Sequence, residues 1–267
     1  MSLAGAPTHS APRSAVGLLI NSVFLENIRR REFYVLLLFM GLFLLGAIVV
    51  RIVGIENAAT ANFLLNLGLT LAFGFAKLIT LLTAARQFPD EMEQRTLYPL
   101  LAKPLSRSDY IIGKWAASVL TGLVTLAVLF LMAYIPVPRL EQYSPTCLLQ
   151  MLLLEVTSIA MLAALAILFS LLLPKAFNLV LLVLTVLAGG RLLALIRNRF
   201  MDSPAYDVVR WITGYFPDFS RLDLLLRYTD GLPALSAPEM LLRIFYAVAF
   251  TAFPLAIAAR LLQSRPL

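Results

Sequence analysis

The sequence predicts an all-α membrane protein with six transmembrane helices, and two observations support this prediction. The first is composition, because 60% of the 267 residues are hydrophobic and only 14% are charged, whereas a soluble domain usually carries about 25% charged residues. The second is that the apolar residues form long blocks, each able to cross a hydrocarbon core of about 30 Å as a helix. Barrel strands are not expected, because the blocks lack alternation of polar and apolar residues.

Six apolar blocks are expected to be the spans, in chain order. They are Phe33–Val50, Phe63–Ala85, Ile111–Ile135, Leu148–Leu173, Ala176–Ile196 and Leu241–Ala259. Residues 1–20 are expected to form a disordered N-terminal tail, because the stretch from Met1 to about Arg13 is polar. Residues 21–267 are then expected to form one six-span transmembrane domain.

The first block has two further features. The run from Ile28 to Tyr34, which contains three consecutive arginines, predicts an N-terminal interfacial helix or only a positive anchor. A cleaved signal peptide is the alternative for this block, since Ala59-Thr60-Ala61 resembles a cleavage site. A secretory apolar region has only about 7–15 residues and lies near the N-terminus, so a span is the favoured interpretation.

Basic residues predict the orientation in the membrane. Twelve lysines and arginines lie beside the spans on one side, whereas the short loops on the other side carry Arg51 and Arg139. Short loops rich in Lys and Arg remain in the cytoplasm, so both termini are expected to be cytoplasmic and the membrane to be the inner one. The long segment from Arg191 to Arg243 holds seven arginines on the outer side, but long loops follow the rule weakly.

Several function classes are excluded by composition. The single Cys147 cannot form an internal disulfide, and the single His9 leaves no cluster for zinc or iron. The net charge of +7 comes mostly from residues that flank spans and meet lipid headgroups. Nucleic-acid binding is therefore not expected, and membrane lipids are the expected partners of these charges.

The segment between spans two and three carries the strongest local signals. Pro89 suits the first position of a helix, and the acidic residues after it, Glu91 and Glu93 among them, suit a helix N-terminus. Pro99 would end that helix after about two turns, and Ser106 with Asp109 would cap the next helix. A short amphipathic helix parallel to the membrane is predicted, with a well-capped loop as the alternative.

The same segment resembles the signature loop of type-2 ABC-transporter permeases, with Arg95 where that family often has glycine. The matching residues are Glu93, Thr96, Leu97, Leu100, Leu101, Ala102, Lys103, Pro104, Leu105, Ser106, Arg107, Tyr110, Gly113 and Lys114. The resemblance implies that Glu91–Arg107 is a coupling helix received by a separate ABC-type ATPase subunit. It implies that ATP-Mg binds to that partner and that this chain binds no cofactor. The chain has no P-loop, because Gly113-Lys114 precedes Trp115, and Lys114 is expected to be a topology anchor.

The outer segment between spans five and six is expected to contain two short helices. One would run from Ser203 to Trp211, and the other would be capped by Ser220 with Asp223 and carry three leucines on one side. Those leucines are Leu222, Leu225 and Leu226. Phe216, Pro217 and Asp218 between the helices resemble the family's proline-centred stretch, which implies an outer gate. Two surface helices on lipid headgroups are the alternative.

Two charged residues fall within predicted spans, Lys77 in span two and Glu155 in span four. Intramembrane charges are functional candidates, so both are candidates for a translocation path. A structural role is the alternative, since Glu155 lies near the outer end and could reach the interface.

The favoured function is therefore the permease subunit of an ATP-driven ABC transporter, with a second copy of itself or a similar permease completing the pathway, and export as the direction. A secondary transporter that uses Lys77 or Glu155 is the first alternative, although no inverted repeat is evident. A membrane-embedded lipid-modifying enzyme is the second, although its acids would need to converge on a metal. The substrate cannot be read from the sequence.

Overall fold

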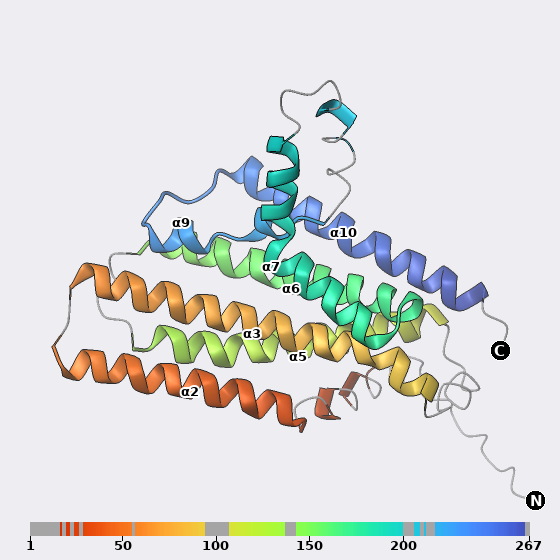
Figure 1. The fold of residues 1–267 in the computed structure, drawn as a ribbon, viewed down its shortest axis with the longest axis horizontal. Coiled ribbons are helices and arrows are strands. Elements are labelled where there is room, and N and C mark those ends of the chain that lie inside the picture. The colour runs from red at the N-terminus through yellow and green to blue at the C-terminus, as the bar shows by residue number, and fades with distance from the viewer. Residues whose placement is uncertain are drawn as a thin grey trace, which may run out of the picture.

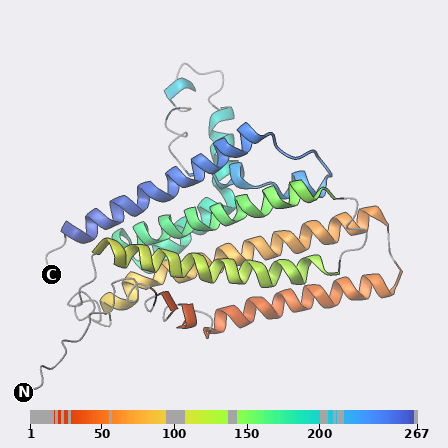
Figure 2. The ribbon, with the colours of Figure 1, turned by 180° about the vertical axis from the view of Figure 1, so that it is seen from behind.

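The computed structural model describes residues 17, 20–21, 24–26, 29–54, 57–93, 107–136, 143–199, 206–208, 211 and 217–264, and this part of the chain contains helices but no strands. The helices are α2 (Arg31–Ile52), α3 (Ala58–Glu93), α5 (Arg107–Tyr134), α6 (Pro145–Leu172), α7 (Lys175–Arg199), the 3-10 helix η2 (Phe219–Leu222), α9 (Leu225–Thr229) and α10 (Ala237–Ser264). The long helices lie side by side in a bundle, and the start of α2 and the end of α10 lie at the same end (Figures 1 and 2).

Five described helices, α2, α3, α5, α6 and α10, are long and apolar enough to cross a membrane. They correspond to predicted spans one to four and six, so the prediction of a multi-pass helical membrane protein is confirmed to that extent. The fifth block lies in α7, where Ala176–Val186 forms an apolar stretch among the fully described residues. Helix α7 bends away from the bundle along its course (Figure 1), and its Gly189-Gly190 pair is the type of sequence at which helices bend. A sixth span remains a prediction.

Local sequence explains where several helices begin and end. Helix α2 ends before Gly54, whose φ of 79° is a conformation that glycine adopts without a steric penalty. Helix α3 begins after Asn57, whose Oδ1 accepts a hydrogen bond from the Thr60 amide at 2.7 Å. Helix α10 begins with a capping box, because the Ser236 amide donates to Glu239 Oε2 at 3.1 Å.

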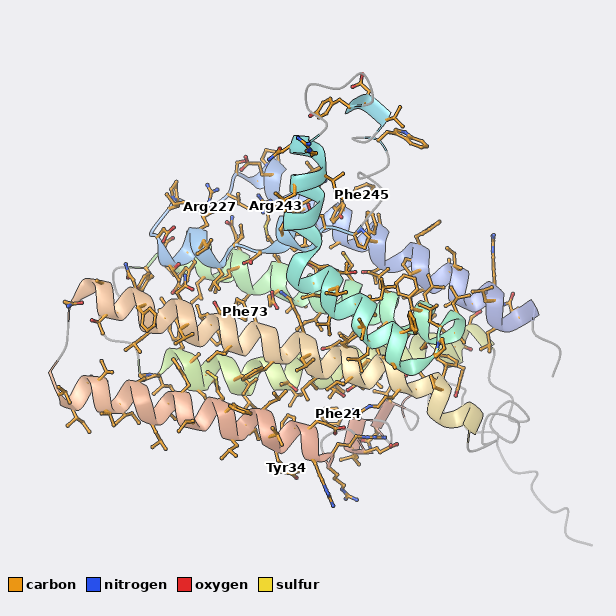
Figure 3. All side chains as sticks on the ribbon, viewed as in Figure 1. Phe24, Tyr34, Phe73, Arg227, Arg243 and Phe245 are labelled. Carbon is orange, nitrogen blue, oxygen red and sulfur yellow. The ribbon has the colours of Figure 1, made fainter. Side chains whose placement is uncertain are left out.

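Helix α6 is the centre of the bundle. It contacts α3, α5, α7 and α10, and 67% of its most apolar stretch is buried, against 17% in α2 and in α10. The outer helices instead carry exposed large apolar side chains, such as Tyr34 and Phe245, both labelled in Figure 3. Because the sequence is that of a membrane protein, these exposed faces are the ones that suit contact with lipid.

Three helices approach one another closely at Gly122 of α5. A Cβ atom there would lie 2.0 Å from Thr80 Oγ1 on α3 and 3.0 Å from Ile159 Cγ2 on α6. Small residues allow helix backbones to approach closely in membranes, where packing drives association. Gly122 therefore permits three helices to meet at one level of the bundle.

One sequence expectation about a helix boundary was wrong. Pro89 does not begin a separate helix, because α3 continues through it to Glu93. Asp90, Glu91 and Glu93 therefore follow the last turns of a long helix and do not begin a new one. A proline near a helix end removes one backbone hydrogen bond and need not terminate the helix in a membrane protein. Arg31–Tyr34 form the first turn of α2, while Ile28 lies outside the described residues, so the interfacial helix and the positive anchor both remain predictions.

Candidate functional site

An ion pair between Lys77 and Glu155 lies inside the bundle. Lys77 Nζ of α3 is 3.0 Å from Glu155 Oε2 of α6, and the two side chains are 14% and 3% exposed. At 1.5 Å per residue, Lys77 lies about 28 Å along α3 from Ala58 and about 24 Å from Glu93. The sequence identified both residues separately but did not pair them. The expectation that Glu155 reaches the interface was wrong, because its side chain turns inward to Lys77.

The Glu155 carboxylate of this pair lacks part of its hydrogen bonding among the described residues. Glu155 Oε1 is buried and has no hydrogen-bond partner there, and neither has Ser158 Oγ one helical turn further on. A buried carboxylate normally accepts several hydrogen bonds, and leaving one oxygen unpaired costs free energy. The pair is therefore held by one close contact rather than by a full network.

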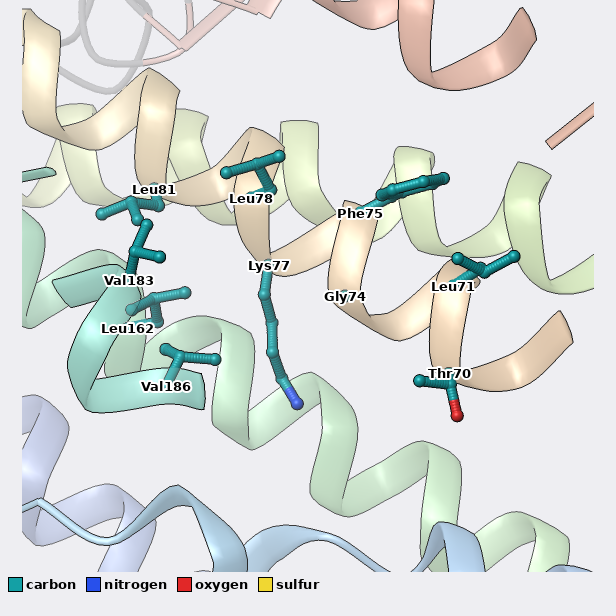
Figure 4. A pocket seen from close by; sticks show the side chains of 10 residues that line it. All are labelled: Thr70, Leu71, Gly74, Phe75, Lys77, Leu78, Leu81, Leu162, Val183 and Val186. Carbon is teal, nitrogen blue, oxygen red and sulfur yellow. The ribbon is translucent and has the colours of Figure 1, made fainter. Parts of the chain in front are cut away.

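A groove with a volume of about 310 Å³ opens beside the ion pair. Its walls come from α3, α6 and α7, and Lys77 and Thr70 are its hydrogen-bonding side chains (Figure 4). The other lining residues are Leu71, Gly74, Phe75, Leu78, Leu81, Leu162, Val183 and Val186. The groove thus offers an apolar channel with a lysine on its wall.

Polar residues extend from Lys77 along the same helix toward α9. Thr70 Oγ1 donates to Asn66 Oδ1 at 3.3 Å, and Asn66 Nδ2 donates to Thr229 Oγ1 at 3.2 Å. The spacing of four residues from Asn62 through Asn66 and Thr70 places these side chains on one face of α3. This stripe leads from a second pocket, lined in part by Asn62, Asn66 and Thr229, toward the groove.

The other end of α3 is joined to the start of α5 by buried polar contacts. Gln87 Nε2 donates to Ser118 Oγ at 2.6 Å and to the Lys114 carbonyl at 3.4 Å. In return, Lys114 Nζ donates to the Gln87 carbonyl at 3.3 Å. The Lys114 ammonium also lies 5.0 Å from the ring centroids of Phe88 and Tyr110, a favourable cation–π geometry. We call Gln87, Phe88, Tyr110, Lys114 and Ser118 the stem cluster.

The position of Lys114 corrects its predicted role as a topology anchor at the headgroups. Its side chain is 1% exposed, so it cannot extend to lipid headgroups. The sequence suggested an anchor because Lys114 stands at the start of an apolar block, where lysines commonly extend to the interface. Lys114 is buried because it lies on the face of α5 that is turned toward α3.

Most residues of the predicted coupling helix lie outside the described residues. These are Arg95, Thr96, Leu97, Leu100, Lys103, Pro104 and Ser106. Glu91 and Glu93 belong to the last turn of α3, and Arg107 is the first residue of α5. The segment therefore connects the two helices that the stem cluster joins, and its docking role remains a prediction.

The outer segment has different caps from those expected. Asp218 Oδ1, and not Ser220 with Asp223, caps η2 by accepting from the Ser220 amide at 3.1 Å and the Ser220 hydroxyl at 2.6 Å. The Asp218 amide donates to the hydroxyl of Tyr246 on α10 at 2.8 Å. Asp223 Oδ1 accepts from the Leu225 amide at 2.9 Å, just before α9. Thus Asp218 ties this segment to α10.

The leucines of this segment do not share one side. Leu222 and Leu225 are buried, whereas Leu226 is 63% exposed.

Of the predicted gate residues, Pro217 lies next to Asp218 and Phe216 is outside the described residues, so the gate remains a prediction. Nearby, burial and a hydrogen bond with Tyr134 at 3.0 Å raise the pKa of Tyr228.

Metal chemistry has no support in the described part of the chain, where no three His, Cys, Asp or Glu residues gather in a group that could hold a metal.

The chain matches, over residues 19–263, the family described as "ABC-2 family transporter protein". No curated protein matches the chain. The match covers α2 to the end of α10, and it agrees with the resemblance seen in the segment between α3 and α5.

Proposed function

Because the chain belongs to the ABC-2 family of transporter proteins and is thus a membrane permease of an ABC transporter, we propose that it exports a substrate with energy from a separate ATPase subunit. Two copies, or this chain and a similar permease, form the pathway between them in the inner membrane. The observation that carries the proposal is the family match, which spans nearly the whole chain.

The arrangement of α3 and α5 supports a coupling role for the segment between them. Residues 94–106 connect the two helices, and the Gln87–Lys114 contacts join the helices just above that segment. Buried hydrogen bonds of this kind resist separation because each broken partner would remain unsatisfied. A push by the ATPase on the segment would therefore move α3 and α5 together.

One observation favours a second function, that of an ion-coupled secondary transporter. The Lys77–Glu155 pair lies within the membrane-spanning part of α3 and α6, and intramembrane ion pairs commonly mark ion or proton pathways. This alternative predicts transport that depends on an ion gradient and not on ATP. The two functions are separated by the experiment below.

The test is a charge reversal, Glu93→Lys, compared with Asp207→Lys in the outer segment. Asp207 is exposed and lines neither pocket, so its reversal is a matched control. We expect Glu93→Lys to weaken co-purification with the candidate ATPase, or to uncouple ATP hydrolysis from transport in liposomes. Membrane insertion should stay intact, since Glu93 lies beyond the apolar span Ala59–Pro89.

The control variant should bind the ATPase and transport normally. If Glu93→Lys also leaves co-purification and ATP turnover unchanged, the segment is only a connector. Transport that persists without ATP and follows an ion gradient would then favour the secondary transporter.

A further inference from the structure

We propose that the groove between α3, α6 and α7 binds an anionic amphipath, with the carboxylate or phosphate head paired to Lys77 and the hydrocarbon chain lying along the apolar wall. This inference deepens the proposed function by naming a substrate class. Binding in the groove does not depend on the proposed function, but export of the bound molecule does.

The walls of the groove suit a hydrocarbon chain. Leu71, Phe75 and Leu78 line it from α3, and Val183 and Val186 line it from α7 (Figure 4). Burying apolar surface of a chain against them releases about 25 cal/mol per Å². A volume of about 310 Å³ is at the lower end of the range for small-molecule sites, which is about 300–1,000 Å³. Part of an acyl chain can therefore be held there.

The Lys77 ammonium supplies the recognition of a head group. An ammonium has three donors, and the described contact of Lys77 Nζ is Glu155 Oε2. Donors in a largely apolar groove favour ligands with acceptor oxygens, and a charged acceptor binds more strongly than a neutral one. A carboxylate or phosphate head meets this requirement, whereas a neutral ester meets it only in part.

Glu155 acts in this scheme as the counter-ion of Lys77 when the groove holds no anion. A lone lysine within a membrane is costly, so a permanent acid nearby keeps the unliganded state stable. Glu155 Oε1 lacks a partner among the described residues, so the acid is not fixed by a complete network. The head group can then share Lys77 with Glu155 Oε2 without breaking further contacts of that acid.

The polar stripe on α3 gives the head group a continuation beyond Lys77. Thr70 lines the groove, and Asn66 is hydrogen-bonded to it on the side toward α9. A head group that leaves Lys77 in that direction meets hydrogen-bonding side chains rather than hydrocarbon alone. This reduces the desolvation cost of moving an anion inside the membrane.

The test measures binding to the purified chain in phosphatidylcholine nanodiscs, with empty nanodiscs as background. The fluorescent C18 carboxylate cis-parinaric acid is compared with its neutral methyl ester, and hexadecyl phosphate is added as a competitor. Two variants are used. Lys77→Met replaces the ammonium by an uncharged side chain of similar length, and the charge exchange Lys77→Glu with Glu155→Lys retains an ion pair. Glu32→Gln is the matched control, since Glu32 pairs with Arg86 away from the groove.

In the wild-type chain we expect the carboxylate to bind at least about tenfold more tightly than the ester, as a charge-assisted contact in an apolar site predicts. Lys77→Met should remove this preference, and the charge exchange should remove it while preserving the fold. The Glu32→Gln control should keep it. Competition by hexadecyl phosphate would show that the site also accepts phosphate heads, and its absence would restrict the site to carboxylates.

Equal binding of acid and ester to the wild-type chain would overturn the proposal, as would a preference that survives both Lys77 variants. The assay contains neither ATPase nor ATP, so its failure leaves ATP coupling untouched. Conversely, if the purified chain binds the anion but no ATPase co-purifies with the wild-type chain in the earlier experiment, the site is supported and the proposed ATP-driven export is not.

Discussion

The substitution Gly122→Ala tests the packing at the level where α3, α5 and α6 meet. The added Cβ would lie 2.0 Å from Thr80 Oγ1, whereas ordinary contacts begin near 3.4 Å. The Thr80 hydroxyl would have to move by about 1.4 Å, which would also weaken its 2.8 Å hydrogen bond to the Ala76 carbonyl. Overpacking of this kind typically costs about 1–3 kcal/mol, and a weakened hydrogen bond about 1 kcal/mol more.

A gain offsets part of this cost, because alanine is a better helix former than glycine by about 1 kcal/mol. The net loss of unfolding free energy should therefore be about 2 kcal/mol. For a chain of this size, that corresponds to a fall in melting temperature of about 4–8 °C. The assay can use the natural sequence, since Cys147 is the sole cysteine and is 1% exposed. A dye that fluoresces on reaction with thiols will report its exposure on heating.

Two further variants decide whether the clash is the cause. Gly41→Ala on α2 should be neutral or slightly stabilising, because nothing lies within 4 Å of the added Cβ. Adding Thr80→Ala to Gly122→Ala should restore part of the lost stability, since the clashing oxygen is removed. If Gly122→Ala melts at or above the wild-type temperature, or if Thr80→Ala gives no rescue, the close approach at Gly122 is refuted.

Three other outcomes are expected. In a Cys147→Ala background, a cysteine at Tyr215 should react with an impermeant maleimide added outside the cell and one at Ser106 should not; the opposite pattern would invert the orientation. Lys114→Met should lower the melting temperature by about 2–8 °C and reduce transport per ATP hydrolysed in liposomes, because the contact with the Gln87 carbonyl is lost; unchanged coupling would separate the stem cluster from function. Asp218→Ala should lower the melting temperature by about 2–4 °C, since a helix cap contributes about 1 kcal/mol, and an unaltered melting curve would contradict its capping role.

The membrane-spanning helices could be predicted from sequence because their cause is local. A block such as Leu148–Leu173 is predominantly apolar, and lipid leaves it no alternative to a helix; the structure places α6 at Pro145–Leu172. Helix α7 shows the limit of that argument, since it bends along its course (Figure 1). A composition rule judges the average of a window and does not locate a bend.

The candidate site was harder to predict because it depends on how helices are rotated against one another. Lys77 and Glu155 were recognisable as unusual, but their pairing requires α3 and α6 to present those faces to each other. The same is true of Lys114, whose burial follows from the orientation of α5 toward α3. The helix start predicted at Pro89 was wrong for a different reason. The preference of proline for the first helical position competes with the tolerance of membrane helices for proline.

The close approach of Gly122 to Ile159 on α6 also gives α3 and α5, which move together, a pivot against α6. At 1.5 Å per residue, Gln87 lies about 10 Å along α3 from Thr80, at the level of this pivot, and Lys77 lies about 4.5 Å from it on the other side. A sideways displacement of about 2 Å at Gln87 would therefore move Lys77 by about 1 Å in the opposite direction. A movement of this size directed away from Glu155 would stretch the 3.0 Å Lys77–Glu155 contact to about 4 Å, beyond hydrogen-bonding distance. A small displacement at one end of the bundle would thus suffice to break the ion pair within the membrane.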